Sequence, residues 1–508
     1  MDIIKNYNKI KNAVFLIDGG EFCFERDLIQ VFNRSQRHHS VAVDLLKVFG
    51  LQESFRVAAT VKLQEGAKPK HMYFVYRITM EYIGLKYTMY ESGNAQIVTD
   101  ENWVTLTAKY DIPPEATVIE FICYIFQLED TDFPNYYIKD YNVEIAEAEK
   151  SVTVTRKTPP LKRQENRTVG VIRWDAYYET GTQRSFVSDQ VARSLSPKKY
   201  HYMAPFFASV TDENKIAFPE ATQAQFDREA EYAIHAGIDY FAYCIYRDNS
   251  PMSYARKQHL LSKHKDKIKM CIILGTTKID DETLMSIVSA VKDSCYLRFD
   301  ARPVFYIYDA FRFDVSLLAT LEGLLKENGV PDIPYYIGMI SQASPNMINT
   351  LIQKGMDAVG AYGCGPLEAG EEYKILAKRT EGTNDLKYVF SKNLDVVPLI
   401  NCGRDTRPRI ETPVTWASGY AGKYSHLATG EELYLHASRV LQKMKREPEK
   451  NIPNTAIVYA WNEHDEGGWC CPTIKVDETG APLFDETGRQ LINTTFLDAI
   501  KKAIEKNK

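Results

Sequence analysis

Toward its C-terminal end the chain reads Ala456-Ile-Val-Tyr-Ala-Trp-Asn-Glu-His-Asp-Glu-Gly-Gly468, an apolar run followed by a cluster of acids. The apolar part, residues 457–461, is rich in β-forming side chains and predicts a buried parallel strand. Glu463 and Glu466 follow this strand, and two glycines then end any regular structure. Two carboxyl groups on a rigid edge can supply the proton donor and acceptor that cleavage of a glycosidic bond requires. The simpler alternative is a solvated polar turn.

Seven similar apolar runs precede this one, and amphipathic helical segments lie between most of them. Thr222 and Gln225 predict the capped start of one such helix, and Gly237 predicts its end. Eight strand–helix alternations predict a (β/α)8 TIM barrel, with a doubly wound open sheet as the alternative. The seven earlier strands are predicted at residues 169–174, 239–245, 270–275, 304–308, 335–339, 357–362 and 396–401.

The N-terminal part of the sequence follows a different pattern. Short alternating segments separated by turn residues, such as 54–62 and 71–79, predict an all-β sandwich. A stretch with several basic residues and Pro159-Pro160 then reads as an exposed linker. We therefore expect a multi-domain chain: a β-sandwich at residues 1–150, a linker at 151–168 and the barrel at 169–508.

The composition is that of a chain able to bury a large core. Hydrophobic residues make up 44% and charged residues 25%, and the net charge of −5 gives no basic surface for nucleic acid or an anionic membrane. No apolar run is long enough for a membrane helix. The nine cysteines are scattered without a C-x-x-C pair, which favours a reducing compartment. Residues 1–9 lack a signal-peptide pattern, so we expect a cytoplasmic protein or one from which a leader has been removed.

In a barrel the residues just after each strand face the same pocket. Here they include aromatic rings, carboxylates and arginines, which suit a polyhydroxylated or anionic ligand. An arginine run at 404–409 can equally be a salt-bridged loop, and Trp174 and Tyr178 can equally pack in the core. Contiguous His464, Asp465 and Glu466 cannot all converge on one ion, so neither a metal nor a cofactor is predicted. The predicted binding residues are Trp174, Tyr177, Tyr178, Tyr246, Tyr362, Arg404, Asp405, Arg409, Asn462, His464 and Trp469.

Two of these runs resemble a known family. Tyr459-Ala-Trp-Asn-Glu-His-Asp-Glu-Gly467 is similar to the strand-eight motif of glycoside hydrolase family 99 and of WbsX-like proteins, and Gly403-Arg-Asp-Thr-Arg-Pro-Arg409 resembles their run after strand seven. The resemblance covers about residues 168–506. His464 and Arg404 stand where the family has tryptophan, and Thr406 where it has asparagine. The N-terminal domain more weakly resembles family 4/9-type carbohydrate-binding modules, through Trp103-Val-Thr-Leu106 and the run at 137–143.

The family resemblance implies a reaction and its residues. Glu463 would act as base on the sugar's own 2-hydroxyl, and Glu466, with a raised pKa, would be the general acid. The reaction would cleave an α-linked glycan through a 1,2-anhydro intermediate and would retain the configuration at the anomeric carbon. A carbohydrate is then the expected partner. The alternatives are a glycosyltransferase or polysaccharide-assembly protein of WbsX type and a non-catalytic carbohydrate-binding protein.

Overall fold

The computed structural model describes residues 13–17, 19–25, 28–82, 85–93, 95–112, 116–129, 131–146, 160–177, 186–276, 278–391, 393–417 and 420–507. These residues divide into two compact units, with the main division at residue 153. Within the described ranges no helix is both long and apolar enough to span a bilayer.

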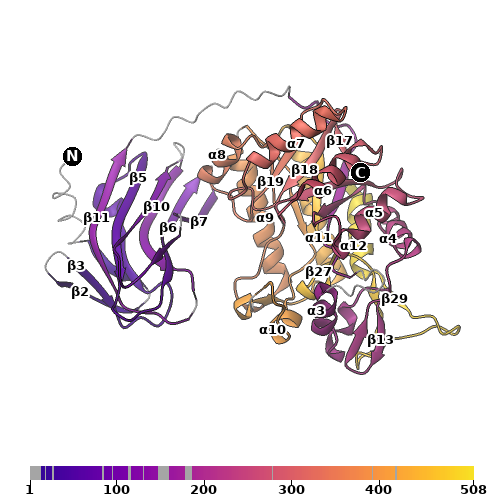
Figure 1. Ribbon diagram of the computed structural model, residues 1–508, viewed down its shortest axis with the longest axis horizontal. Helices are drawn as coiled ribbons and strands as arrows, with labels where there is room; N and C mark the ends of the chain where they lie inside the picture. Colours follow the sequence, from indigo (N-terminus) through magenta and orange to yellow (C-terminus); the bar gives the residue numbers. More distant parts are fainter. Residues whose placement is uncertain are drawn as a thin grey trace. The chain divides into compact units, whose positions relative to one another are not determined.

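The first unit consists of two antiparallel sheets (Figure 1). One has the order β1-β4-β10-β6-β7 with β8 beside β6, and the other has the order β2-β3-β11-β5-β9. The bounds are β1 (Val14–Ile17), β2 (Glu21–Glu25), β3 (Leu28–Phe32), β4 (Ser40–Asp44), helix α2 (Leu45–Phe49), β5 (Ser54–Leu63), β6 (Lys70–Tyr82), β7 (Leu85–Ser92), β8 (Gln96–Val98), β9 (Val104–Asp111), β10 (Ala116–Gln127) and β11 (Tyr136–Ala146).

Aromatic rings join these two sheets. The rings of Phe55 in β5 and Phe121 in β10 lie 5.0 Å apart, and those of Tyr76 in β6 and Tyr110 in β9 lie 6.1 Å apart. All four side chains are fully buried, because alternate residues of each strand point to the same side. The prediction of antiparallel sheets is confirmed, and the sandwich stays our interpretation of these contacts.

The second unit contains one curled sheet of parallel strands, and each of the eight predicted strands overlaps an observed one. Most of their residues are buried, as expected of a parallel sheet covered by helices. The order is β22-β20-β19-β18-β16-β15-β12-β25-β23. The bounds are β12 (Thr168–Arg173), β15 (Tyr240–Cys244), β16 (Lys269–Leu274), β18 (Arg302–Ile307), β19 (Tyr335–Met339), β20 (Ala358–Gly360), β22 (Asp395–Val396), β23 (Leu399–Asn401) and β25 (Thr455–Tyr459).

The predicted seventh strand is split into β22 and β23 by Val397 and Pro398. The N–H of Val397 donates to the carbonyl of Val359 at 2.8 Å, and the N–H of Ile457 donates to the carbonyl of Pro398 at 3.0 Å. Proline has no N–H of its own to extend the ladder, which accounts for the break. The segment therefore bonds to β20 on one side and β25 on the other, and the sheet is consistent with a TIM-like barrel.

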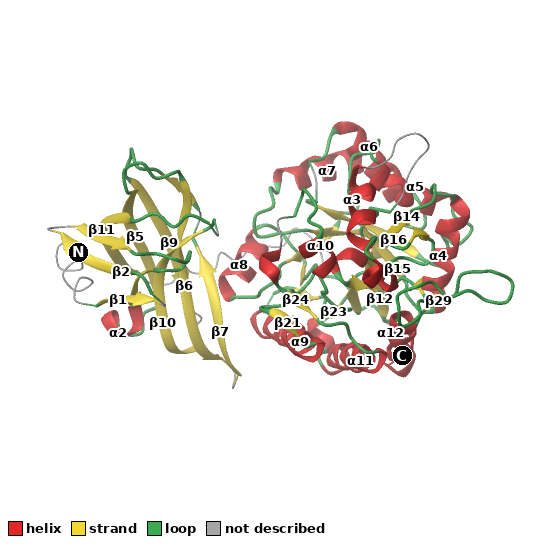
Figure 2. Ribbon diagram, turned by 90° about the horizontal axis from the view of Figure 1, so that it is seen from below, coloured by secondary structure: helices red, strands yellow, loops and turns green. Residues whose placement is uncertain are grey.

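Helices lie around the outside of the parallel strands (Figure 2). Helix α4 begins as predicted, since the Thr222 side chain accepts a hydrogen bond from the N–H of Gln225. The bounds are α3 (Phe186–Leu195), α4 (Gln223–His235), α5 (Tyr254–Leu261), α6 (Asp281–Lys292), α7 (Ser316–Glu327), α8 (Pro345–Gln353), α9 (Tyr373–Phe390), α10 (Arg407–Glu411), α11 (Gly430–Arg446) and α12 (Thr495–Asn507). Short strands lie in the loops: β13 (Ser209–Asp212), β14 (Lys215–Ala217), β17 (Arg298–Phe299), β21 (Ala369–Glu371), β24 (Tyr424–Ser425), β26 (Asn462–Glu463), β27 (Gly468–Trp469), β28 (Thr473–Ile474) and β29 (Ile492–Asn493).

A buried charged cluster joins β12 and β25, which are the first and last strands of the parallel sheet in chain order. Arg173 at the end of β12 pairs with Asp175 at 2.7 Å and with Glu229 of α4 at 2.9 Å. Glu229 also accepts a hydrogen bond from the indole N–H of Trp461, which follows β25. Because β12 and β25 are hydrogen-bonded neighbours, this cluster fixes the strand ends from which the acidic residues project.

Candidate active site

The acidic residues after β25 lie in a tight hairpin. Strands β26 and β27 pair through Glu463 and Gly468, and the one-turn helix η5 (His464–Glu466) connects them. Gly467 ends this turn with a φ of +75°, and a Cβ there would come within 1.9 Å of the backbone nitrogen of Asp405. Only glycine fits such an approach. Gly467 thus packs the hairpin against the loop that follows β23, and Gly468 packs it against the ring of Tyr459.

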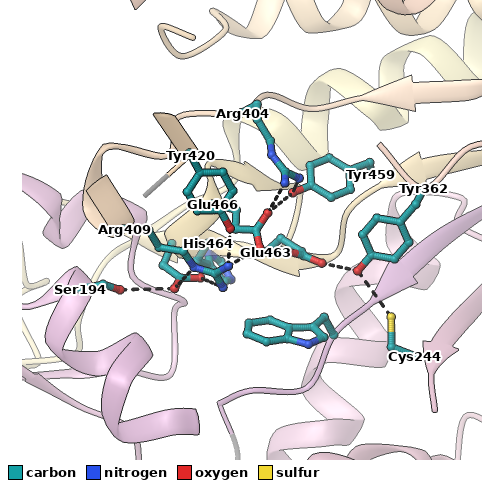
Figure 3. Close-up of polar contacts among 12 residues, drawn as sticks. Ser194, Cys244, Tyr362, Arg404, Arg409, Tyr420, Tyr459, Glu463, His464 and Glu466 are labelled. Carbon is teal, nitrogen blue, oxygen red and sulfur yellow. Dashed lines mark hydrogen bonds and ion pairs between the residues drawn. The ribbon is translucent and has the colours of Figure 1, made fainter. Parts of the chain in front are cut away.

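Glu463 sits at the edge of this hairpin and is nearly buried, with 3% of its surface exposed. The hydroxyl of Tyr362, which follows β20, donates a hydrogen bond to its carboxyl group (Figure 3). Burial, together with the negative charge of Glu466, raises the pKa of Glu463 to about 8. At neutral pH Glu463 therefore holds a proton, as a general acid must.

Glu466 lies beside Glu463 but in the opposite electrostatic environment. Its carboxylate pairs with Arg404 at 2.5 Å and also with Arg409, and the hydroxyl of Tyr459 donates to it at 3.2 Å. Burial by itself would raise the pKa of Glu466, but the two guanidinium groups outweigh it and lower the pKa to about 2. A side-chain hydrogen bond with Glu463 acts in the same direction. Glu466 is therefore ionised at neutral pH.

These protonation states are the reverse of those that the family resemblance implied. A raised pKa was expected for Glu466, and the structure instead raises the pKa of Glu463. The reason is that Arg404 and Arg409 both reach Glu466. Figure 3 shows Arg404 above the carboxyl pair and Arg409 to its left. An adjacent positive charge favours the charged form of a carboxyl group.

The arginines after β23 are paired inside the protein. Arg409 binds Asp465 with two nitrogens, at 2.7 and 3.0 Å, as well as Glu466, and Arg407 pairs with Asp405 at 2.6 Å. With Glu463 protonated, the charges of Arg404 and Arg409 are balanced by Asp465 and Glu466. The salt-bridged loop, rather than the anionic-ligand site, is the interpretation that these contacts support.

Five predicted binding residues are covered by other side chains and hold the site together instead. The side-chain oxygen of Asn462 accepts a hydrogen bond from the backbone N–H of Trp174, and its side-chain nitrogen donates one to Asp175. His464 packs between the rings of Tyr177 and Trp469, and burial lowers its pKa to about 3, so it stays neutral. At most 2% of the surface is exposed for Tyr177, Asp405, Arg409, Asn462 and His464.

Trp469 faces a different cavity. Its ring also lies 5.4 Å from that of Phe496 in α12, and it lines a cavity of about 190 Å³ together with Tyr202, Thr429, Cys470 and Phe496. Neither Glu463 nor Glu466 lines this cavity. Trp469 was predicted to bind substrate at the carboxyl pair, and the structure places it in this separate cavity instead.

The remaining predicted residues border the carboxyl pair. Tyr246, Tyr362 and Arg404 are half-buried, and Trp174, which is 8% exposed, donates its indole N–H to the hydroxyl of Tyr246 at 2.7 Å. Tyr178 lies outside the described residues. Within the described part of the chain, no group of three His, Cys, Asp or Glu side chains is placed to hold a metal ion.

Two tyrosines that were not predicted as site residues complete the site. Tyr420, with a φ of +46°, accepts a hydrogen bond from Arg409 at 2.7 Å, and Tyr459 accepts one from Arg404. Tyr459 was quoted as part of an apolar strand, and its place in the Tyr-x-x-Asn-Glu run was the signal that could have marked it. Tyr420 lies in a loop without periodicity and had no such signal.

No protein-family model and no curated protein matches this sequence. Among solved structures, a GH99 endo-alpha-mannosidase from Bacteroides thetaiotaomicron is 13% identical, with 67% of this chain and 98% of that chain covered and a TM-score of 0.44. The CBM22-1 xylan-binding domain of Paenibacillus barcinonensis Xyn10C is 19% identical over 27% of this chain and 88% of that domain, with a TM-score of 0.24. At such low identities and TM-scores these similarities do not identify a function.

Proposed function

We propose that this protein is a glycoside hydrolase whose (β/α)8 barrel cleaves an α-linked glycan. The observation that carries the proposal is the pair Glu463 and Glu466, two adjacent carboxyl groups whose pKa values are moved in opposite directions, to about 8 and about 2. Two titratable groups separated in this way are suited to be the acid and the base of one reaction. The strand-eight resemblance to glycoside hydrolase family 99 supports the same reaction class.

In the proposed first step Glu463 donates its proton to the glycosidic oxygen as that bond breaks. Glu466 accepts the proton of the sugar's 2-hydroxyl, whose oxygen attacks the anomeric carbon and forms a 1,2-anhydro sugar. In the second step water opens this ring: Glu463 takes a proton from the water, and Glu466 returns its proton to the 2-oxygen. The two inversions retain the configuration. A pKa of about 2 makes Glu466 a weak base, so its proton transfer must accompany the attack of the oxygen.

The proposed substrate is a neutral sugar with a 1,2-trans bond, of which α-linked mannosides are one case. A 2-hydroxyl can attack only from the face opposite the leaving group, which requires that configuration. The internal pairing of Arg404 and Arg409 supports a neutral rather than an acidic sugar. The first unit is proposed to bind carbohydrate, because its sequence resembles carbohydrate-binding modules.

An aryl α-mannoside and its 2-O-methyl analogue test this mechanism. We expect hydrolysis of the first with the α-anomer formed first in NMR spectra, and binding without hydrolysis of the second. Cleavage of the 2-O-methyl compound would replace the 2-hydroxyl by a conventional enzyme nucleophile. Binding without cleavage for every glycan in a broad screen would instead support the non-catalytic alternative.

The pH dependence of kcat/KM should follow the two carboxyl groups in the free enzyme. Glu463 must be protonated, so activity is expected to be full below its pKa of about 8 and to fall as the pH rises through that value. Glu466 must be ionised, so the acidic limb should lie far lower, near its pKa of about 2. A profile with both limbs between pH 4 and 6 would contradict the described pairing, whereas loss of the alkaline limb in Glu463→Gln would assign that limb.

A further inference from the structure

Two exposed aromatic rings flank the carboxyl pair, and neither was among the predicted site residues. Tyr308, directly after β18, and Trp416, in the loop after α10, are each 40% exposed. Large apolar side chains are usually buried, so an exposed ring beside a polar site needs a reason. Aromatic rings with a polar handle are common where a ligand has both apolar and polar faces.

Tyr308 reaches the site from the side of Glu463. Its ring stands edge-on to that of Tyr362 at 5.1 Å, and Tyr362 donates its hydroxyl hydrogen to Glu463. After burial, the charges of Glu463 and then of Glu466 are the largest causes that raise the pKa of Tyr308. Tyr308 is therefore linked to Glu463 through the ring and hydroxyl of Tyr362.

Trp416 reaches the site from the side of Glu466. The guanidinium carbon of Arg409 lies 5.6 Å from the centre of the Trp416 ring and 5.2 Å from that of Trp174. The two tryptophan rings are themselves 6.1 Å apart. Since Arg409 pairs with Glu466, successive contacts connect Tyr308, through Tyr362, Glu463, Glu466 and Arg409, to Trp416.

The backbone that carries each exposed ring is fixed by hydrogen bonds. The N–H of Tyr308 donates to the carbonyl of Leu274 at 2.8 Å, which continues the ladder of the neighbouring strand β16. Trp416 follows Thr415, whose N–H donates to the buried side chain of Gln190 at 2.7 Å, while the same amide donates to the Thr415 hydroxyl at 3.2 Å. A buried glutamine that binds one residue twice fixes the turn carrying Trp416, so ordering the ring costs little on binding.

We propose that Tyr308 and Trp416 are stacking platforms for sugar rings on opposite sides of the bond that is cleaved. The substrate is then an oligosaccharide with at least one sugar ring on each side of that bond, rather than a single terminal sugar on a small leaving group. This inference rests on the proposed hydrolase function. It adds the two specificity-determining residues and places the cleaved bond between them.

Binding is measured first, apart from chemistry. In a Glu466→Gln background, titration calorimetry with an α-linked mannotetraose should show affinity lowered about tenfold by Trp416→Ala and likewise by Tyr308→Ala, the scale of one lost ring contact. Trp416→Phe and Tyr308→Phe keep a ring and should restore most of the affinity. Phe484→Ala, which removes a ring that is 57% exposed on another hairpin, is the matched control and should change nothing.

Catalysis then separates the two platforms. An aryl monosaccharide reaches only one of them with its sugar, so one alanine variant should lose kcat/KM on this substrate while the other loses it mainly on mannotetraose. Unchanged affinity in both alanine variants overturns the platforms even if Glu463 and Glu466 prove essential for hydrolysis. Equal losses on both substrates with a lower Tm would assign both rings a structural role and also overturn the proposal. Lost affinity in a protein that hydrolyses no glycan would reject the hydrolase, and with it the cleaved bond between the rings, while leaving both rings as glycan contacts.

Discussion

Replacing either Glu463 or Glu466 by glutamine should lower kcat/KM on an oligosaccharide by at least about a hundredfold, the usual scale of general acid–base catalysis. Glutamine has the size of glutamate but neither donates a proton as an acid nor carries the negative charge. Both variants should fold normally by circular dichroism. The matched control is Glu381→Gln, which should keep its activity. Glu381 lies on the outer helix α9 and pairs with Arg439 of α11.

The two glutamine variants should differ when the leaving group changes. The dinitrophenolate of a dinitrophenyl glycoside leaves without being protonated. Glu463→Gln should therefore recover most of its activity on that substrate, while Glu466→Gln stays inactive. This pattern would confirm Glu463 as the acid, in agreement with its raised pKa. Recovery in Glu466→Gln alone would instead restore the roles that the family resemblance implies, and near-normal activity of both variants on oligosaccharides would remove this pair from the mechanism.

Removing Arg409 should have the largest effect on stability. Arg409→Met leaves the buried Asp465 without its bidentate partner and Glu466 with Arg404 alone, and uncompensated buried charge of this kind costs about 3–5 kcal/mol. Urea unfolding followed by tryptophan fluorescence can measure it, because four of the five tryptophans, all but Trp103, belong to the second unit. The control is Arg247→Met, which removes an exposed pair with Asp280 and should leave the stability nearly unchanged.

The sign of the pH effect gives a second check on Arg409. The arginines hold the pKa of Glu466 at about 2, below its ordinary value, so their stabilising contribution is present above pH 4.5 and fades as the pH falls toward 2. The difference between Arg409→Met and the unaltered protein should therefore narrow in acid. If the difference in unfolding free energy stays constant from pH 7 to pH 3, the destabilisation comes from the lost packing of the Arg409 side chain against Trp174 and Trp416, and not from its lost charge.

The sequence predicted where the acids lie but not which of them holds the proton. Runs such as residues 456–461 are apolar enough to identify a buried strand, and strand ends identify the face of the sheet where the acids gather. The pKa values depend instead on Arg404 and Arg409, which lie more than fifty residues earlier in the chain, and on which carboxylate each one reaches. That choice is made by the packing of two loops, through Gly467 against Asp405, and leaves no local pattern.

Trp416 and Tyr308 illustrate the same limit from another side. Tyr308 is the last residue of a predicted strand, but nothing in the sequence distinguishes an exposed ring from the many buried tyrosines. Trp416 belongs to a loop held by Gln190 in α3, a residue 225 positions earlier than Thr415. Contacts between distant loops decide exposure, and exposure decides whether a ring packs in the core or meets a ligand.

The buried cluster of Arg173, Asp175 and Glu229 ties the beginning of the parallel sheet to its end, through Trp461. During synthesis on the ribosome, β12 emerges almost three hundred residues before β25, and until then the cluster lacks its indole donor and the sheet lacks its last strand. Both glutamates also arrive with that last segment. If the proposed function holds, a growing or prematurely terminated chain is therefore inactive, and the onset of activity would report that the whole second unit has been completed.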